Sequence, residues 1–392
     1  MTQVQEYGKA QDAEERARFA PIAAVSFGAT VEQVQKWLDS NAKNVRVVRR
    51  HGAVVGGLIL IPMGQFFGGR RVSMTGVAGV AVAPEYRGRG VATAMMRSAV
   101  KEMRRSGATL STLYPATWPL YRRVGYELAG DYFRFSMPAR TIGISDRALE
   151  VKSIEAGDMK TIKKLYRAHA AYRNGWLDRG EYVWDRVSGP REGRAPQGYA
   201  VLGANGIEGY LFYRVKDSEE ERYTIAISDM VSSSAQATRR LLSLLADHGS
   251  LAKEVVWHGG ADDPFLYSLP DRCYEVSQYE TWMLRILDVK RALAERGYPQ
   301  GLDMRLELYV VDDLIRANRG RYVLDISDGV GEVKSGGRGS LRLDIRALAA
   351  LYAGYHSPQA LAELGAIEGS PRTLACAATV FAGSTPSLRD FF

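Results

Sequence analysis

Apolar residues in the first third of the chain follow two spacings, one typical of helices and one typical of strands. Helical spacing covers 13–23, 31–39 and 91–106. Runs of apolar and β-branched residues, typical of strands, cover 45–49, 54–62, 71–82, 110–114 and 126–137. The dipeptide His51-Gly52 separates the first two runs at hairpin spacing. The strand, helix, strand order over 71–114 predicts a right-handed crossover between parallel strands in a mixed α/β domain.

The middle of the chain repeats this order of elements more weakly. Strand, turn and strand over 199–215 are followed by a strand at 223–231, a helix at 235–248 and a strand at 253–258. Ser232-Ser233-Ser234 stands where the first copy has arginines and glycines. We therefore expect a duplicated domain that has lost a phosphate site. Chance similarity between two α/β segments is the alternative.

The pattern changes again after Trp282. Strands of an antiparallel sheet are predicted at 303–311, 321–326, 330–334 and 341–345. Helices are predicted at 346–352, 358–364 and 372–381. Strands followed by helices indicate a separate α+β domain. We therefore divide the chain into residues 1–145, 146–285 and 286–392, which suits the two or three domains expected of 392 residues at about 150 per domain.

Composition and charge exclude several classes of protein. The most apolar stretch, 53–63, is far shorter than the about 20 residues of a spanning helix, and residues 1–18 lack the apolar segment of a signal peptide. We expect a cytoplasmic protein with no membrane span. Cys273 and Cys376 show no metal-ligand spacing, so neither a disulfide framework nor a metal site is indicated.

The net charge of +8 suits a polyanionic partner, either a nucleic acid or the phosphates of a nucleotide. Lys and Arg are spread along the chain without a basic helix or a motif that reads nucleic acid. This distribution weakens the nucleic-acid alternative, which predicts retention on nucleic acid that falls steeply with salt.

The most specific motif is the segment Val80-Ala81-Val82-Ala83-Pro84-Glu85-Tyr86-Arg87-Gly88-Arg89-Gly90-Val91-Ala92. A strand ends, a glycine-containing turn follows and a helix begins, so free backbone N–H groups can bind a pyrophosphate. Gly88 and Gly90 allow close approach, and Arg87 and Arg89 add positive charge. The spacing matches neither a P-loop nor a G-x-G-x-x-G fingerprint. An ordinary strand-to-helix turn with solvated arginines is the alternative.

Arg-x-x-Gly-x-Ala after a Val-x-Val strand resembles the acetyl-CoA motif of the GNAT superfamily of N-acetyltransferases. The resemblance implies acetyl-CoA as co-substrate and no metal. It implies that the backbone of Val80, Ala81 and Val82 pairs with the pantetheine arm, and that a backbone N–H near Val80 polarises the acetyl oxygen. The pyrophosphate site that it implies consists of Arg87, Gly88, Arg89, Gly90, Val91, Ala92 and Thr93.

A second segment, 113–126, ends in Tyr-x-x-x-Gly-Tyr and resembles the part of these enzymes where a tyrosine protonates the departing thiolate of CoA. Tyr121 matches that tyrosine. A phenol with a pKa of about 10 keeps its proton at neutral pH and can donate it. Ala116 and Thr117 are expected along the path of the co-substrate. The alternative for Tyr121 is a side chain that only packs there.

The layout of the whole chain resembles the enhanced intracellular survival acetyltransferases. The resemblance rests on the weaker second copy of the first domain, the segment 286–293, the helix end at 351–354 and the aromatic C-terminus. It implies a GNAT domain, a degenerate GNAT-like domain and a sterol-carrier-protein-like domain. It also implies that the terminal carboxylate of Phe392 acts as general base, that the chain forms a hexamer, and that the substrates are aminoglycoside-like polyamines or lysine side chains.

The sequence leaves other interpretations of its site residues and of its function open. Better-studied relatives carry an acidic residue directly before the last aromatic residue, whereas this chain ends Asp390-Phe391-Phe392. His51 and Glu85 are competing candidates for the base, both in predicted turns. A terminal aromatic anchor with a solvated carboxylate is the alternative for Phe392. A lipid-carrying protein that uses only its C-terminal domain is the alternative to an enzyme.

Overall fold

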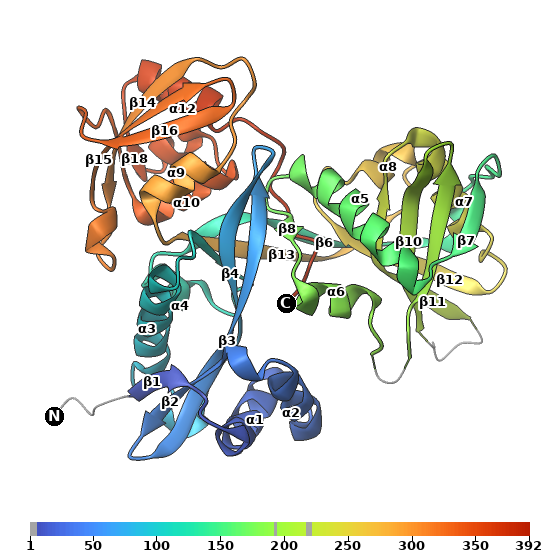
Figure 1. Cartoon of the computed structure of the whole chain (residues 1–392), viewed down its shortest axis with the longest axis horizontal. Helices are drawn as coiled ribbons and strands as arrows, with labels where there is room; N and C mark the ends of the chain where they lie inside the picture. Colours follow the sequence, from blue (N-terminus) through green and yellow to red (C-terminus); the bar gives the residue numbers. More distant parts are fainter. Residues whose placement is uncertain (1–5, 192–193, 217–221) are drawn as a thin grey trace.

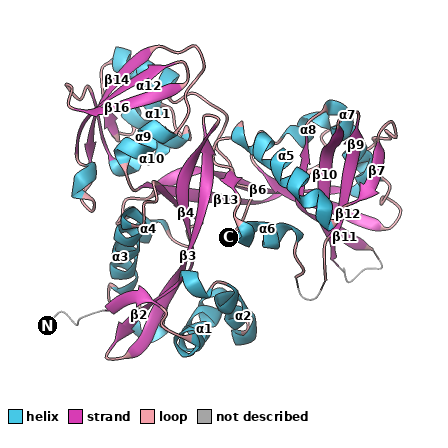
Figure 2. Ribbon diagram, viewed as in Figure 1, coloured by secondary structure: helices cyan, strands magenta, loops and turns pink. Residues whose placement is uncertain are grey.

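The computed structural model describes residues 6–191, 194–216 and 222–392. Figure 1 shows three lobes, formed in order by the N-terminal third, the middle and the C-terminal part of the chain. The first two lobes share one mixed sheet, whose strands run in the order β1-β2-β3-β4-β5-β13-β6-β12-β11-β10-β9-β7. The third lobe has its own sheet in the order β16-β15-β14-β17-β18. Figure 2 shows strands of this sheet, in magenta, beside the helices of the same lobe.

The N-terminal elements form where the apolar spacing predicts them. Asp12 caps the first helix by accepting a hydrogen bond from the N–H of Glu15, and Thr30 and Gln33 form a capping box at the second. The elements are β1 (Glu6–Lys9), α1 (Ala13–Phe27), α2 (Val31–Ser40), β2 (Val45–Arg50), β3 (Ala53–Phe67), β4 (Arg70–Val82), α3 (Val91–Arg105), β5 (Leu110–Leu113), α4 (Trp118–Arg122) and β6 (Glu127–Pro138).

The alternation of side chains along β3 places helices on both faces of the sheet. Ile59 and Ile61 belong to the cluster that includes α1 and α2, whereas Leu58 and Leu60 belong to the cluster that includes α3. Successive residues of a strand point to opposite faces, so α3 and the α1–α2 pair lie on opposite sides of β3 and β4. Figure 1 shows this arrangement.

The predicted crossover is confirmed, and it leaves an opening in the sheet. β4 and β5 are parallel, and their pairing runs from Met74 opposite Leu110 to Gly76 opposite Thr112. β4 continues to Val82 while paired with β3 on its other side. Because β5 ends at Leu113, the described strands leave the last six residues of β4 without a partner on that edge.

The middle of the chain repeats the strand, helix, strand order of the first domain, as predicted. β11 and β12 are parallel around α7, as β4 and β5 are around α3. The elements are β7 (Glu150–Ser153), α5 (Met159–Ala171), β8 (Leu177–Asp178), α6 (Glu181–Ser188), β9 (Gln197–Gly203), β10 (Gly206–Lys216), β11 (Tyr223–Ser232), α7 (Ala235–Ala246), β12 (Ala252–Gly259), α8 (Pro264–Ser268) and β13 (Glu275–Ile286).

The two related halves exchange their last strands. β13, which follows the second copy, pairs with β5 of the first, and β6, which follows the first copy, pairs with β12 of the second. β6 and β13 also pair with each other in the middle of the sheet. The limits at residues 145 and 285 remain predictions of folding units, and the hydrogen bonding of the sheet crosses both of them.

The third lobe is an α+β unit, but its sheet is not wholly antiparallel. β14 and β17 are parallel, with Leu308 opposite Leu341, so the expectation of an antiparallel sheet is wrong for this pair. The strands follow the predicted segments, but their order in the sheet places two non-consecutive strands side by side. The elements are α9 (Val289–Glu295), β14 (Met304–Val311), β15 (Gly320–Ser327), β16 (Val330–Ser335), β17 (Leu341–Asp344), α10 (Ile345–Ala353), α11 (Pro358–Glu363), β18 (Ile367–Glu368) and α12 (Pro371–Val380).

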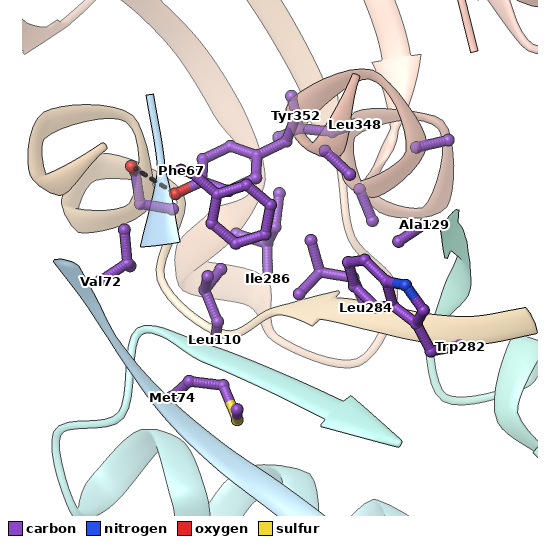
Figure 3. Close-up of a cluster of buried hydrophobic side chains, with 14 of the residues drawn as sticks. Phe67, Val72, Met74, Leu110, Ala129, Trp282, Leu284, Ile286, Leu348 and Tyr352 are labelled. Carbon is purple, nitrogen blue, oxygen red and sulfur yellow. Dashed lines mark hydrogen bonds between the residues drawn. The ribbon is translucent and has the colours of Figure 1, made fainter. Parts of the chain in front are cut away.

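One apolar cluster joins the third lobe to the shared sheet. Figure 3 shows Phe67 of β3 against Tyr352 of α10, and their ring centroids lie 5.0 Å apart. Trp282 and Leu284 of β13 belong to the same cluster and are fully buried. Burial of aromatic and aliphatic surface on this scale fixes the third lobe against the sheet, and with it the origin of the C-terminal segment.

Candidate active site

The turn between β4 and α3 has the backbone that an anion site requires. Gly88 and Gly90 have φ values of 72° and 78°, and no atom lies within 4 Å of where a Cβ would be on either of them. These left-handed conformations favour glycine. Among the described residues, no side chain caps α3, and the first N–H groups of the helix, from Gly90 to Thr93, have no partner within the helix. The open turn and the uncapped helix fit a diphosphate.

The two arginines of the turn differ in their contacts. Arg87 donates from Nε to the carbonyl of Val82 (3.0 Å) and from Nη2 to Oγ of Ser26 (3.0 Å), so its guanidinium holds the turn against β4 and α1. Arg89 is exposed at the mouth of the helix. Arg89 is therefore the freer of the two for a phosphate contact.

In the second copy of the domain, the corresponding helix end, at the start of α7, is capped by a side chain. The hydroxyl of Ser234 accepts a hydrogen bond from the N–H of Ala237 and so caps α7, while its proton goes to the carboxylate of Glu208 (2.8 Å). A capped helix end beside a carboxylate does not attract a phosphate. This geometry agrees with the expectation that the second copy has lost its phosphate site.

A β-bulge interrupts β4 at the edge of the opening. Ile59 of β3 pairs with Ala78, but Gly57 pairs with Ala81, so β4 has one extra residue between these pairs. Gly79 supplies the left-handed conformation of the bulge, with a φ of 63°, and a Cβ there would lie 2.7 Å from the ring of Trp37. Bulges redirect the backbone next to them. Val80, near which a backbone N–H is expected to polarise the acetyl oxygen, directly follows this bulge.

A cavity of about 550 Å³ occupies the opening between β4 and β5. Of the predicted site residues, it brings together Val80, Ala116, Tyr121 and Phe392. Ala81 and Val82 are buried in the strand, and Thr117 is exposed beside α4 and does not line the cavity. The remaining lining residues are Phe27, Ala29, Gln33, Val34, Trp37, Val77, Ala78, Gly79, Tyr114, Arg186 and Phe391.

Tyr121 lies on α4 with its ring packed among apolar side chains and its side chain only 4% exposed. Burial raises the pKa of its phenol to about 12. Among the described residues, none accepts a hydrogen bond from the Tyr121 hydroxyl, so its proton is free for a group inside the cavity. This position suits a general acid at neutral pH.

The C-terminal segment returns from the third lobe and lies along β6. Asp131 of β6 forms an isolated parallel bridge with Ser387, and its carbonyl accepts a hydrogen bond from the N–H of Leu388 (3.3 Å). Tyr114 donates from Oη to the carbonyls of Leu388 (2.6 Å) and Asp390 (3.2 Å). The last residue, Phe392, is 7% exposed, and its ring covers Gly76 of β4.

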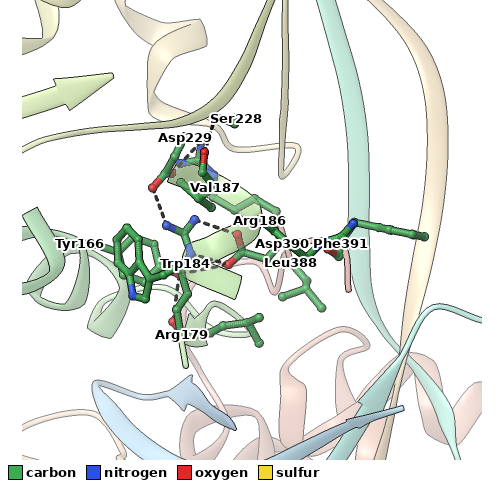
Figure 4. Close-up of polar contacts among 12 residues, drawn as sticks. Tyr166, Arg179, Trp184, Arg186, Val187, Ser228, Asp229, Leu388, Asp390 and Phe391 are labelled. Atoms are coloured by element: carbon green, nitrogen blue, oxygen red, sulfur yellow. Dashed lines mark hydrogen bonds and ion pairs between the residues drawn. The ribbon is translucent and has the colours of Figure 1, made fainter. Parts of the chain in front are cut away.

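A buried ion-pair network anchors this segment two residues before its end (Figure 4). Arg179 donates to both carboxylate oxygens of Asp390, at 2.9 Å from Nε and 2.8 Å from Nη2, and also to Asp229 on β11. Its guanidinium stacks 3.7 Å from the ring centroid of Tyr166. Burial alone would raise the pKa of Asp229, but the charges of Arg179 and Arg389 hold it below the usual value. Asp390 therefore anchors this C-terminal segment, which we call the tail, and does not line the cavity.

Sequence reasoning missed Arg179 and Asp229 as parts of this arrangement. Arg179 follows a two-residue strand, and Asp229 lies inside β11, so no motif or spacing marks either residue. A charged residue inside a strand rich in apolar residues was the one available signal, because an ionised side chain is rarely buried without a partner.

The competing candidates for the base lie elsewhere. His51 is exposed in the β2–β3 turn and Glu85 is exposed before α3, and neither lines the cavity. His258 stacks on Tyr132 at 4.8 Å, and burial lowers its pKa to about 4, so it is neutral at pH 7. Within the described residues, no three His, Cys, Asp or Glu side chains gather as a metal site would require. Every helix among them is too short or too polar to span a bilayer.

Comparison with protein families matches each of the three parts. Residues 7–129 and residues 175–286 each match a model described as an acetyltransferase (GNAT) domain, and residues 289–389 match one described as a sterol carrier protein domain. The predicted fold class is thereby confirmed. The N-terminal match includes the turn, the helix α3 and Tyr121.

Known proteins resemble the chain over most of its length. A GCN5-related N-acetyltransferase from Anabaena variabilis has a structure with a TM-score of 0.95 and 32% identity, over 99% of this chain and 100% of that one. N-acetyltransferase Eis of Mycobacterium tuberculosis is 27% identical, over 87% of this chain and 88% of that protein. An uncharacterized N-acetyltransferase of Streptomyces griseus is 29% identical over 77% of each.

Three observations indicate the same family. They are the opening beside β4, the uncapped helix α3 and the three matched domains. The similarity to the Anabaena variabilis enzyme covers both chains almost completely, and the domain order is the one that the resemblance implied. The chain is an N-acetyltransferase of the GCN5-related superfamily and belongs to its enhanced intracellular survival (Eis) family.

Proposed function

We propose that this enzyme transfers the acetyl group of acetyl-CoA directly to a primary amine, with Tyr121 as general acid and the terminal carboxylate of Phe392 as general base. One observation carries the proposal. A single cavity is lined by Val80 after the bulge, by the buried phenol of Tyr121 and by the last residue of the chain. GNAT enzymes use acetyl-CoA, and the uncapped start of α3 fits the diphosphate of that co-substrate.

The site residues have separate roles in binding acetyl-CoA and in the transfer. Gly88 to Thr93 hold the diphosphate, the edge of β4 at Val80, Ala81 and Val82 pairs with the pantetheine arm, and the N–H near Val80 polarises the acetyl oxygen. The carboxylate of Phe392 accepts a proton from the amine as its nitrogen bonds to the acetyl carbon. Tyr121 gives its proton to the CoA sulfur as the C–S bond breaks. The products are the N-acetyl amine and CoA.

Direct transfer needs no covalent intermediate on the protein. Holding both substrates in one cavity makes the reaction effectively unimolecular, which supplies much of the rate gain. Both cysteines are free thiols outside the cavity, and the mechanism uses neither as a nucleophile. The family resemblance supports aminoglycoside-like polyamines or lysine side chains as acceptors.

Acetyl-CoA turnover with a panel of amines tests the proposal. We expect wild type to release CoA only when an amine is present. Tyr121→Phe and a chain that lacks Phe392 should each lose most of that activity, because one removes the acid and the other moves the base. Tyr267→Phe changes a tyrosine that is 96% exposed and serves as the matched control. Equal turnover by all four proteins would refute the assignment of both residues.

The same proposal includes hexameric assembly and a cytoplasmic location, both from the family resemblance. Sedimentation of the purified chain measures the first, and fractionation of the producing cells measures the second.

The alternative of a lipid carrier is not favoured by the third lobe. A cavity of about 960 Å³ in that lobe has Arg305, Arg338 and Arg372 in its walls, together with Glu307. Charged walls suit a polar ligand better than an apolar lipid chain.

A further inference from the structure

The cavity is lined from α1, α2, β4 and α4, and no residue from the start of α3 lines it. The start of α3, which fits the diphosphate, is on one face of β3 and β4, and α1 and α2 are on the other. Trp37 of α2, Arg186 of α6 and the aromatic tail line the cavity. Acetyl-CoA that enters past α3 leaves the α2 side for the second substrate. The walls on this side therefore define which amine the enzyme accepts.

Apart from the carboxylate of the last residue, these walls carry charge of only one sign. All fifteen residues that line the cavity lie in the described part of the chain, and none of them is Asp or Glu. The nearest side-chain carboxylate along the tail, that of Asp390, is committed to Arg179 and Tyr166. An ammonium group that enters an enclosed site loses its water and needs a carboxylate or another acceptor in return. A polyamine with several ammonium groups would find a carboxylate partner for only one of them, at the last residue of the chain.

Aromatic rings surround the position of the terminal residue. The ring of Tyr114 lies 4.8 Å from that of Phe391 and 6.0 Å from that of Phe392, measured between centroids. Trp37 completes this side of the cavity and packs over Gly79. Ring faces attract one ammonium group and pack against flat apolar bodies. The site can therefore receive one ammonium group beside the base, attached to an apolar body.

Arg186 is the one charged side chain of these walls. Its Nε donates to the carbonyl of Phe391 (3.0 Å) and its Nη1 to Oη of Tyr182 (3.4 Å), while Tyr182 also accepts from Nε1 of Trp37 (3.0 Å). These bonds fix the guanidinium from two sides. A guanidinium has five N–H donors, so others remain for a ligand, and a carboxylate matches their geometry.

We infer that the preferred substrate is a monoamine with a flat apolar body that carries a carboxylate within reach of Arg186. The inference rests on the function proposed above and specifies the substrate class of the same site. It differs from the polyamine class that the family resemblance supports. A fixed cation, aromatic walls and the absence of Asp and Glu from the fifteen lining residues together carry it.

Three amines of one shape test the inference on the full-length enzyme with acetyl-CoA. 4-(Aminomethyl)benzoate carries a carboxylate, 4-methylbenzylamine carries no second charge, and 4-(aminomethyl)benzylamine carries a second ammonium group. An aminoglycoside completes the panel. We expect kcat/KM to fall in that order, with roughly a tenfold or greater difference between the first and the third, because a charge-assisted bond is replaced by repulsion. The difference should lie mainly in KM for the amine.

Arg186→Glu should reverse the order of the carboxylate and the diamine, and Arg186→Gln should bring the two closer together. Lys160→Glu, at an exposed position of α5, makes the same change in net charge and should leave the wild-type order intact. If the Arg186 variants do not fold, the four amines measured with the wild-type enzyme still test the substrate class. Faster acetylation of the diamine or the aminoglycoside than of the carboxylate would overturn the substrate class and leave the acetyltransferase function standing. No acetylation of any amine would overturn the proposed function itself.

Discussion

The environment of Tyr121 determines how its chemistry depends on pH. Burial raises the pKa of its phenol to about 12, so the phenol keeps its proton below that pH and loses it only as the pH rises through about 12. We expect no decrease in kcat from this group on the alkaline side up to about pH 10, where an ordinary tyrosine would begin to ionise. A pH profile of kcat measures this. An alkaline decrease near pH 9 in wild type that is absent from Tyr121→Phe would contradict the expectation.

Asp390 positions the last residue through its ion pair with Arg179. In Asp390→Asn the guanidinium of Arg179, which is fully buried, loses one of its two carboxylate partners. We expect kcat to fall by about tenfold or more while KM for acetyl-CoA stays unchanged, because the tail and not the diphosphate site is disturbed. Carboxypeptidase should then release Phe392 faster than from wild type, which keeps this residue buried.

Asp247→Asn is the matched control, because Asp247 pairs with Arg147 at the exposed surface and far from the tail. It should change neither kcat nor the rate of carboxypeptidase release. If Asp390→Asn also left both quantities unchanged, the buried ion pair would have no part in positioning the terminus.

Among the elements, the bulge of β4 has the most direct consequence for the site. Gly79→Ala puts a side chain at a φ of 63° and within 2.7 Å of Trp37, so the bulge must flatten or Trp37 must move. The left-handed conformation alone costs about 1–2 kcal/mol for a residue with a Cβ. We expect kcat/KM for acetyl-CoA to fall by about tenfold or more.

Gly69→Ala is the control for backbone strain without a change at the bulge. Gly69 has a φ of 85° in the β3–β4 turn, and no atom lies within 4 Å of a Cβ there. It should lose stability but keep its activity per folded molecule. Equal activity of the two variants after correction for the folded fraction would show that the bulge does not shape the site.

Most elements could be predicted because their signals are local. The repeat of Val91, Met95, Ala99 and Met103 marks α3, and all four residues are buried in the structure. The bulge could not be predicted, because Gly79 lies in a run of small residues that would fit an unbroken strand equally well. The motif before α3 indicated an anion site, but it did not show that Arg87 bonds to Val82 and Ser26.

Across the whole molecule, the long-range pairings escaped prediction. β13 lies between β5 and β6, so Ile286 pairs with Leu110 and Glu275 with Ser136, and no periodicity in the sequence encodes such distant pairings. Arg179 and Asp390 are 211 residues apart for the same reason. Only the family resemblance predicted that Phe392 returns to the site. The cavity supports this prediction, because Phe392 is one of its lining residues.

A buried ion pair between β13 and the third lobe should contribute to the stability of the whole chain. Nη2 of Arg285 donates to both oxygens of Asp312, at 2.9 and 2.8 Å, and both side chains are almost fully buried. Asp312→Ala leaves an unpaired buried guanidinium, which costs about 3–5 kcal/mol. Urea unfolding should show that loss, and Arg285→Met with Asp312→Leu should recover part of it. A loss below about 1 kcal/mol would exclude a structural role for the pair.

The position of the terminal carboxylate is the central claim for this enzyme, and a chain extended by one glycine after Phe392 tests it most directly. The extension keeps the buried ring and moves only the carboxylate, whereas Phe392→Ala keeps a carboxylate at the original chain length. We predict that CoA release in a single turnover with an amine slows by about a hundredfold in the extended chain and by much less in Phe392→Ala. An extended chain as fast as wild type would contradict the account, because the base would then have to be another group.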